Sequence, residues 1–190
     1  APGEIKGLFR CLANNSIFSA FIFTVVSTGS KKGEPAMPKL RKALIQDAEN
    51  IHRLINSYAN QGLMLARSRN MVYECIREFT IAEDDNGEFL GVGGLHIIWE
   101  DLAEIRALAI EPKAVGRGLG KSIVEALVEE AKQLGIKRVF SLTYQKEFFE
   151  HCGFRLISKE EMPTKVWKEC INCPKFPNCD ELAMIRDLEQ

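Results

Sequence analysis

The most informative pattern in this chain is a set of glycines at alternate positions. Gly116, Gly118 and Gly120 follow an apolar segment and stand directly before a long helical pattern. Glycine lets the backbone approach a ligand closely, and the first N–H groups of a helix have no partner inside it. Together with the helix dipole, these groups form a seat for a phosphate or pyrophosphate. The turn is therefore a candidate binding site for a phosphorylated cofactor. The alternative is a glycine-rich helix start without a ligand.

The surroundings of this turn differ from those of the glycine-rich turn in dinucleotide-binding domains. There, the turn normally follows the first strand of a unit and precedes another parallel strand. Here it follows a predicted strand at 102–110, which comes after two apolar runs at 79–83 and 89–99. Asn86-Gly87 separates these runs, and that dipeptide predicts an antiparallel hairpin. The turn therefore belongs to a different arrangement of strands.

The cysteines favour a thiol or metal cluster over a disulfide framework. Cys170, Cys173 and Cys179 lie close together near the end of the chain. A closed zinc site takes four ligands, so these cysteines form only part of one. The remaining ligand would have to come from elsewhere: His151, Cys152 or Asp180. The alternative is a packed tail with reduced thiols, and the sequence leaves zinc open.

Length and charge narrow the possible functions. A chain of 190 residues is expected to form one domain with its own core. The net charge of -1 gives no indication of binding to nucleic acid or to an anionic membrane. We therefore expect a small-molecule partner, no nucleic acid and no membrane.

The first 36 residues differ from the rest of the chain. They contain an apolar run at 17–26, preceded by Lys6 and Arg10, which is too short to span a membrane. Such a segment can be an upstream stretch included by an early start, a targeting or anchoring segment, or an extra helix packed on the domain. We expect the first, with Met37 as the working start. Residues 1–36 then form an extension and 37–190 the domain.

Hydrophobic periodicity predicts the order strand, helix, helix, three strands, helix, strand, helix, strand. The expected strands are 40–45, 79–83, 89–99, 102–110, 139–142 and 154–158. Asp47 and Ser68 are expected to begin the first two helices, which would end at Gly62 and at Arg77. The third helix should run from the glycine turn to Gly135, and a short fourth should cover 147–152. This order is typical of a mixed sheet with helices on both faces.

Over residues 40–158, this order and the glycine turn resemble the GNAT superfamily of acetyl-CoA-dependent N-acetyltransferases. Segment 104–112 looks like its central strand, 115–120 like its pyrophosphate loop, and 148–154 like its late helix-to-strand element. The resemblance implies an α+β fold with a largely antiparallel central sheet, helices on both faces and acetyl-CoA as co-substrate. Two positions depart from the family pattern. Val115 replaces the usual Arg or Gln, and Phe149 replaces a Tyr that often protonates the leaving thiolate.

Segments 62–68, 142–149, 162–167 and 169–181 resemble short, single-domain bacterial N-acetylglutamate synthases. That resemblance implies a cytoplasmic enzyme, expected as a homodimer, that acetylates the α-amine of L-glutamate at the start of arginine biosynthesis. The alternatives are another acceptor, such as a different amino acid, a polyamine or a protein N-terminus, or a non-catalytic acetyl-CoA-binding module. A polyamine enzyme should line its pocket with carboxylates, whereas the candidate residues in this chain are basic.

Direct acetyl transfer needs a neutral amine, a polarised thioester carbonyl and a route for the proton. An amino-acid amine is mostly protonated at neutral pH, so a base must help. Glu104 is expected to act as that base through water; the alternative is a solvent-facing strand residue. Tyr144 is expected to protonate the thiolate; the alternative is a core aromatic with a satisfied hydroxyl.

The remaining predicted site residues bind the two substrates. Arg67, Arg106 and Lys146 are expected to hold the carboxylates of glutamate, with an exposed surface charge as the alternative for each. The predicted acetyl-CoA residues come from the central strand and the glycine turn: Leu108, Ala109, Ile110, Gly116, Arg117, Gly118, Leu119, Gly120 and Lys121.

Overall fold

A computed structural model of the chain describes residues 38–163, 175 and 178–188. All of them belong to the compact unit Pro35–Gln190. The predicted extension at 1–36 lies outside the described residues, as do Cys170 and Cys173. Within the described part of the chain, no helix combines the length and apolar character needed to cross a membrane.

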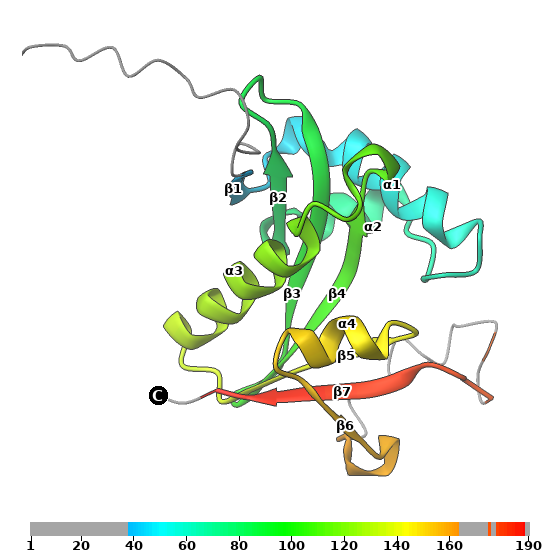
Figure 1. Cartoon of the computed structure of the whole chain (residues 1–190), viewed down its shortest axis with the longest axis vertical. Coiled ribbons are helices and arrows are strands. Elements are labelled where there is room, and N and C mark those ends of the chain that lie inside the picture. Colours follow the sequence, from blue (N-terminus) through cyan, green and yellow to red (C-terminus); the bar gives the residue numbers. More distant parts are fainter. Residues whose placement is uncertain (1–37, 164–174, 176–177, 189–190) are drawn as a thin grey trace, which may run out of the picture. The chain divides into compact units, whose positions relative to one another are not determined.

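The centre of the fold is a seven-stranded sheet with the order β1-β2-β3-β4-β5-β7-β6 (Figure 1). Neighbouring strands are antiparallel except β4 and β5, which are parallel. The strands are β1 (Lys39–Lys42), β2 (Phe79–Glu83), β3 (Phe89–Trp99), β4 (Leu102–Ile110), β5 (Arg138–Thr143), β6 (Arg155–Ile157) and β7 (Leu182–Asp187). The predicted α+β class with a largely antiparallel sheet is confirmed.

Helices cover both faces of this sheet. They are α1 (Ala48–Ala59), α2 (Arg69–Glu74), α3 (Leu119–Gln133) and α4 (Lys146–His151). Side chains alternate between the two faces along a strand. In β2, Phe79 and Ile81 pack in the apolar cluster that holds the buried residues of α1 and α2. Ala82 packs in the other large cluster, together with the buried faces of α3 and α4. We call these sides the α1–α2 face and the α3–α4 face.

Several predicted boundaries were wrong. β1 ends at Lys42, not at residue 45, because a 3₁₀ turn at Ile45–Asp47 leads into α1. Ser68 begins α2, and its Oγ accepts a hydrogen bond from the Met71 N–H at 3.2 Å. That helix stops at Glu74, however, and a 3₁₀ turn, Ile76–Glu78, follows before β2. β7 was not predicted at all, although it pairs with both β5 and β6.

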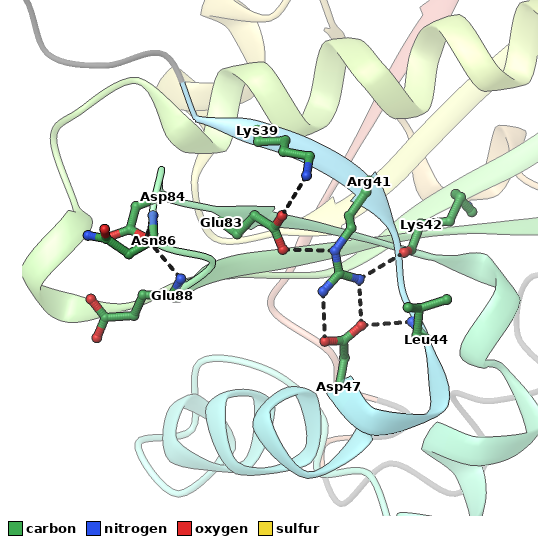
Figure 2. Close-up of polar contacts among 9 residues, drawn as sticks. All are labelled: Lys39, Arg41, Lys42, Leu44, Asp47, Glu83, Asp84, Asn86 and Glu88. Atoms are coloured by element: carbon green, nitrogen blue, oxygen red, sulfur yellow. Dashed lines mark hydrogen bonds and ion pairs between the residues drawn. The ribbon is translucent and has the colours of Figure 1, made fainter.

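A hydrogen-bonded group around Arg41 fixes the first strand to α1 and to the hairpin (Figure 2). Its guanidinium donates to both carboxylate oxygens of Asp47, at 2.7 and 3.1 Å, and to Glu83 at 2.8 Å. The hydrogen bond from Arg41 is the main cause that holds the pKa of each carboxyl below its usual range. Both acids are therefore ionised at neutral pH. Each such charged hydrogen bond contributes about 1.5–3 kcal/mol, so the start of α1 is firmly placed.

The pairing between β4 and β5 is short. It covers only residues 102–104 of β4, although β4 continues to Ile110 and β5 to Thr143. Beyond this point the two strands diverge (Figure 1). Among the described residues, the β5-side edge of β4 at 105–110 has no strand partner. An unpaired strand edge presents backbone N–H and C=O groups that can bind an extended ligand.

Candidate active site

The glycine turn leads from β4 into α3 with the geometry of an anion site. Gly116 and Gly118 have φ of 82° and 78°, in the left-handed region that favours glycine. Gly118 is the N-cap of α3, so its N–H and those of Leu119, Gly120 and Lys121 have no acceptor within the helix. A Cβ at Gly116 or Gly118 would meet no atom within 4 Å. The backbone of this loop is therefore accessible to a phosphate, and this arrangement fits the pyrophosphate of acetyl-CoA.

Packing against α4 gives a further reason for a glycine at position 120. A Cβ at this position would lie 3.2 Å from ring atoms of Phe148 in α4. The glycine therefore allows α4 to pack closely behind the first turn of α3. Arg117 and Lys121 are exposed on either side of this turn, where phosphate oxygens of the cofactor can reach them.

Along β4, a bulge marks the start of the predicted cofactor strand. Val92 pairs with Ala109 and Gly94 with Arg106, so β4 has one more residue than β3 between these pairs. Ala107 lies in the bulge with φ of 54°, which is rare for a residue other than glycine. The bulge redirects the backbone at Leu108, on the part of β4 that no longer pairs with β5. Bulges of this kind often occur next to active sites.

Polar side chains interrupt the α1–α2 face at the centre of the sheet. Ala103 and Ile105 pack on the α3–α4 face, so alternation places Glu104 and Arg106 on the opposite one. On that face Leu102, before them, belongs to an apolar cluster with Phe140. The cluster under α1 and α2 begins beyond Arg106. Burying a charged side chain between two apolar clusters costs free energy unless the charge is paired or has a function. We call Glu104 and Arg106 the polar strip, and it is the candidate site for the acceptor.

Arg106 is tied into a network that the sequence did not reveal. Its Nη2 donates to Glu78 Oε2 at 2.9 Å and lies 3.6 Å from the sulfur of Cys75. The other oxygen of Glu78 accepts a hydrogen bond from His96 Nδ1 at 2.9 Å. Burial alone would raise the pKa of Glu78, but His96 and Arg106 hold it below its usual range. Glu78 is therefore an ionised carboxylate between two cationic or donor groups.

Arg67 is buried, although it lies on the irregular connection between α1 and α2. Its residue is only 7% exposed. The side-chain amide of Asn56 holds its backbone on both sides: Nδ2 donates to the Arg67 carbonyl at 2.8 Å, and Oδ1 accepts from its N–H at 3.2 Å. An arginine buried on a connection, with its backbone held in this way, is more typical of a binding site than of a surface. The alternative of an exposed charge is therefore wrong for Arg67, and also for the buried Arg106.

α1 is also fastened to the end of β4. The hydroxyl of Tyr58 donates to the carbonyl of Ile110 at 2.6 Å, and Arg53 pairs with Glu111. These contacts join the helix that carries Asn56 to the strand that leads into the glycine turn. The buried arginine and the anion-binding loop are thus positioned by the same helix.

Tyr144 directly follows β5 and is held by the segment before β7. Its hydroxyl donates to Asp180 Oδ1 at 2.7 Å and accepts from Lys175 Nζ at 2.5 Å. Burial, and to a lesser degree the hydrogen bond to Asp180, raise the pKa of Tyr144 against the opposing effect of Lys175. The phenol therefore keeps its proton at neutral pH. Donation to a thiolate would require the O–H to turn away from Asp180.

The remaining predicted residues lie apart from this strip. Lys146 begins α4, which packs on the α3–α4 face, and its ammonium is 3.5 Å from Glu150. Cys179 is half-buried, with its sulfur 3.7 Å from Glu181. Within the described part of the chain, no group of three or more His, Cys, Asp or Glu side chains is arranged to hold a metal ion. Burial raises the pKa of the Cys152 thiol, which is unsuited to nucleophilic attack in that state.

Two comparisons define the class of this protein. Residues 45–154 match the acetyltransferase (GNAT) family, and the chain belongs to that family. It is therefore an acetyltransferase enzyme that uses acetyl-CoA, as the resemblance implied. An uncharacterized N-acetyltransferase of Chlorobaculum tepidum is 38% identical over 149 residues, which are 78% of this chain and 96% of that protein. An amino-acid acetyltransferase of Mycobacterium tuberculosis is 37% identical over 134 residues, 70% of this chain and 76% of that protein.

Solved structures with the same fold contain the cofactor. One is a Mycobacterium tuberculosis protein in complex with CoA, with a TM-score of 0.71 and 32% sequence identity to this chain. The match covers 80% of this chain and 100% of that protein. N-acetylglutamate synthase from Neisseria gonorrhoeae, complexed with coenzyme A and N-acetyl-glutamate, has a TM-score of 0.74 and 30% identity over 83% of this chain. The match covers only 36% of that synthase, so the present chain corresponds to about a third of the longer protein.

Proposed function

We propose that this protein transfers the acetyl group of acetyl-CoA to the α-amine of L-glutamate. The observation that carries the proposal is the buried Arg67. Asn56 of α1 holds its backbone on the connection between α1 and α2, the two helices that cover the sheet face to which Glu104 and Arg106 belong. Its support from comparison is the synthase of Neisseria gonorrhoeae, whose structure holds N-acetyl-glutamate, and the relative named amino-acid acetyltransferase. The reaction would be the first step of arginine synthesis. The cytoplasmic location and the homodimer stay predictions.

In the proposed reaction, the chain's own groups divide the work between binding and proton transfer. The first-turn N–H groups of α3 would hold the pyrophosphate, and the β5-side edge of β4 at 105–110 would hold the extended arm of the cofactor. N–H groups at the bulge after Ala107 would polarise the thioester carbonyl. These groups would bind acetyl-CoA near the point where β4 and β5 stop pairing.

The amine reaches this carbon from the α1–α2 face. Glu104 removes a proton from the ammonium through water, and the neutral amine attacks the carbonyl. The C–N bond forms and the C–S bond breaks. Tyr144 supplies a proton to the departing thiolate. The nitrogen loses two protons in all. One is matched by the proton that the thiolate gains to become a thiol, and the other is released to solvent.

Substrate choice in this proposal depends on a planar arginine fork. A charge-assisted pair between Arg67 and a carboxylate is worth about 1.5–3 kcal/mol. Arg67→Ala should therefore raise the KM for glutamate on the order of tenfold to a hundredfold and leave the KM for acetyl-CoA almost unchanged. Arg67→Lys should restore only part of the loss, because an ammonium lacks the planar fork. Steady-state kinetics with each substrate varied in turn measures both effects.

Arg69→Ala is the matched control for this experiment. Arg69 lies two positions away, is exposed, and pairs with Glu49 at 2.8 Å, so its loss should leave both KM values near those of the unmodified enzyme. Glutamine should be a poorer substrate than glutamate, and Arg67→Ala should narrow this gap if Arg67 holds the side-chain carboxylate. An unchanged KM for glutamate in Arg67→Ala would remove this residue from the acceptor site.

A further inference from the structure

His96 stands directly opposite the proposed base in the sheet. In the antiparallel register of β3 and β4, its partner is Glu104. Directly opposed residues point to the same face, with Cβ atoms about 4.5–5.5 Å apart. Other side chains on that face of β3 are apolar: Val92 packs under α1, and Ile98 packs against the cluster with Phe140. His96 is therefore part of the same polar strip as Glu104 and Arg106.

The hydrogen bond between His96 and Glu78 assigns the tautomer of the imidazole. Glu78 is an ionised carboxylate and can only accept, so the bond of 2.9 Å must come from a proton on Nδ1 of His96. In the neutral ring, Nε2 then carries the lone pair and can accept a proton. The hydrogen bond to this carboxylate holds the ring in its orientation. Arg106, in turn, holds Glu78 in place through its second oxygen at 2.9 Å.

Exposure distinguishes the two ends of this network. The side chain of Arg106 is 6% exposed, whereas those of His96 and Glu78 are 31% and 26% exposed. A proton that arrives at His96 can therefore reach solvent. The charged or titratable groups around the imidazole are Glu78 from the turn before β2, Glu104 and Arg106 from β4, and Cys75 at the end of α2.

We propose that His96, oriented by Glu78, takes up the proton that Glu104 removes from the acceptor and passes it to solvent. This inference rests on the proposed function, because it needs Glu104 as the base. One proton moves from the ammonium to the Glu104 carboxylate, then to Nε2 of His96, and then to water or buffer. No redox step or further reactant is involved. Glu104 is thereby returned to its ionised form for the next turnover.

His96→Asn tests this relay against a purely structural role. The asparagine amide can place an N–H near the position of Nδ1, so it keeps the hydrogen bond to Glu78 but cannot carry a proton. We expect kcat to fall by about tenfold to a hundredfold with the KM for acetyl-CoA unchanged. In this variant, kcat should rise with the concentration of imidazole in the assay, whereas the unmodified enzyme should be insensitive to it.

Two further variants keep the test decisive. His96→Gln is used in the same way if thermal unfolding shows that the asparagine variant is not folded at the assay temperature. In the double variant with Glu104→Gln, the loss from His96 should vanish, since no proton arrives from position 104. An unchanged kcat in the folded variant, or a loss that imidazole does not restore, overturns the relay. If Glu104→Gln itself keeps the full rate, the proposed base is wrong, which separates failure of the mechanism from failure of the relay.

Discussion

Glu104→Gln should lower kcat by roughly 10²–10⁴-fold while the affinity for acetyl-CoA stays nearly intact. The substitution keeps the size and hydrogen-bonding reach of the side chain and removes only its capacity to accept a proton. The acceptor amine would then react only in the small fraction that is already neutral. The rate of the variant should accordingly rise with pH over the range in which the free amine loses its proton. Stopped assays of thiol release across pH, together with calorimetry for acetyl-CoA, measure both properties.

Glu100→Gln provides the matched control for that experiment. Glu100 lies in the exposed turn between β3 and β4, four residues before Glu104, and should tolerate the same change. If the rate and the pH–rate profile of Glu104→Gln both equal those of the control, a different group is the base. The general base would then be another residue on the α1–α2 face.

Gly118→Pro should abolish measurable binding of acetyl-CoA and leave the domain folded. Proline fixes φ near -65° and lacks the N–H, whereas Gly118 has φ of 78° and contributes one of the free N–H groups at the start of α3. Losing charge-assisted donors to the pyrophosphate, each worth about 1.5–3 kcal/mol, reduces affinity by about a hundredfold or more. Calorimetric titration with CoA measures the loss, and circular dichroism checks the fold.

Gly87→Pro is the control for this loop. Gly87 has the same φ of 78°, and a Cβ there would also meet no atom within 4 Å, but it lies in the β2–β3 hairpin. Gly87→Pro should lower the free energy of unfolding by about as much as Gly118→Pro does, and the affinity for CoA should stay unchanged. Equal affinities for CoA in Gly118→Pro and in this control would disprove the assignment of the glycine turn as the pyrophosphate site.

Local sequence patterns were sufficient where one segment determines its own structure. Asn86-Gly87 between apolar runs predicted the hairpin, and the glycine turn before an amphipathic stretch predicted the start of α3. β7 was missed because its residues 182–185 form a short apolar run without alternation, and this run pairs with strands from other parts of the chain. The pairing that makes this run a strand is a long-range property, which a local pattern does not contain.

The same distinction explains the site. Arg106 was predicted because it interrupts an apolar strand, and Glu104 because it lies near the start of the strand that resembles the central strand of the family. Glu78 and His96 were missed, since only the register between β3 and β4 and the turn before β2 bring them to those residues. The predicted strands at 89–99 and 102–110 are separated by only two residues. Pairing them as a second hairpin would have placed His96 near Glu104. Lys146 was grouped with the arginines on sequence proximity to Tyr144, but α4 packs on the other face.

The central claim is acetyl transfer to the α-amine of glutamate, and a direct assay of the unmodified chain of 190 residues tests it. The chain is incubated with acetyl-CoA and, in separate reactions, with each free amino acid, a polyamine or a peptide with a free N-terminus. Release of the CoA thiol is followed, and the product is identified by mass spectrometry. We predict that glutamate gives the highest kcat/KM, about tenfold or more above glutamine, with N-acetylglutamate as the product. Thiol release with glutamate no faster than without an acceptor, alongside clear turnover of another acceptor, would contradict the proposed function.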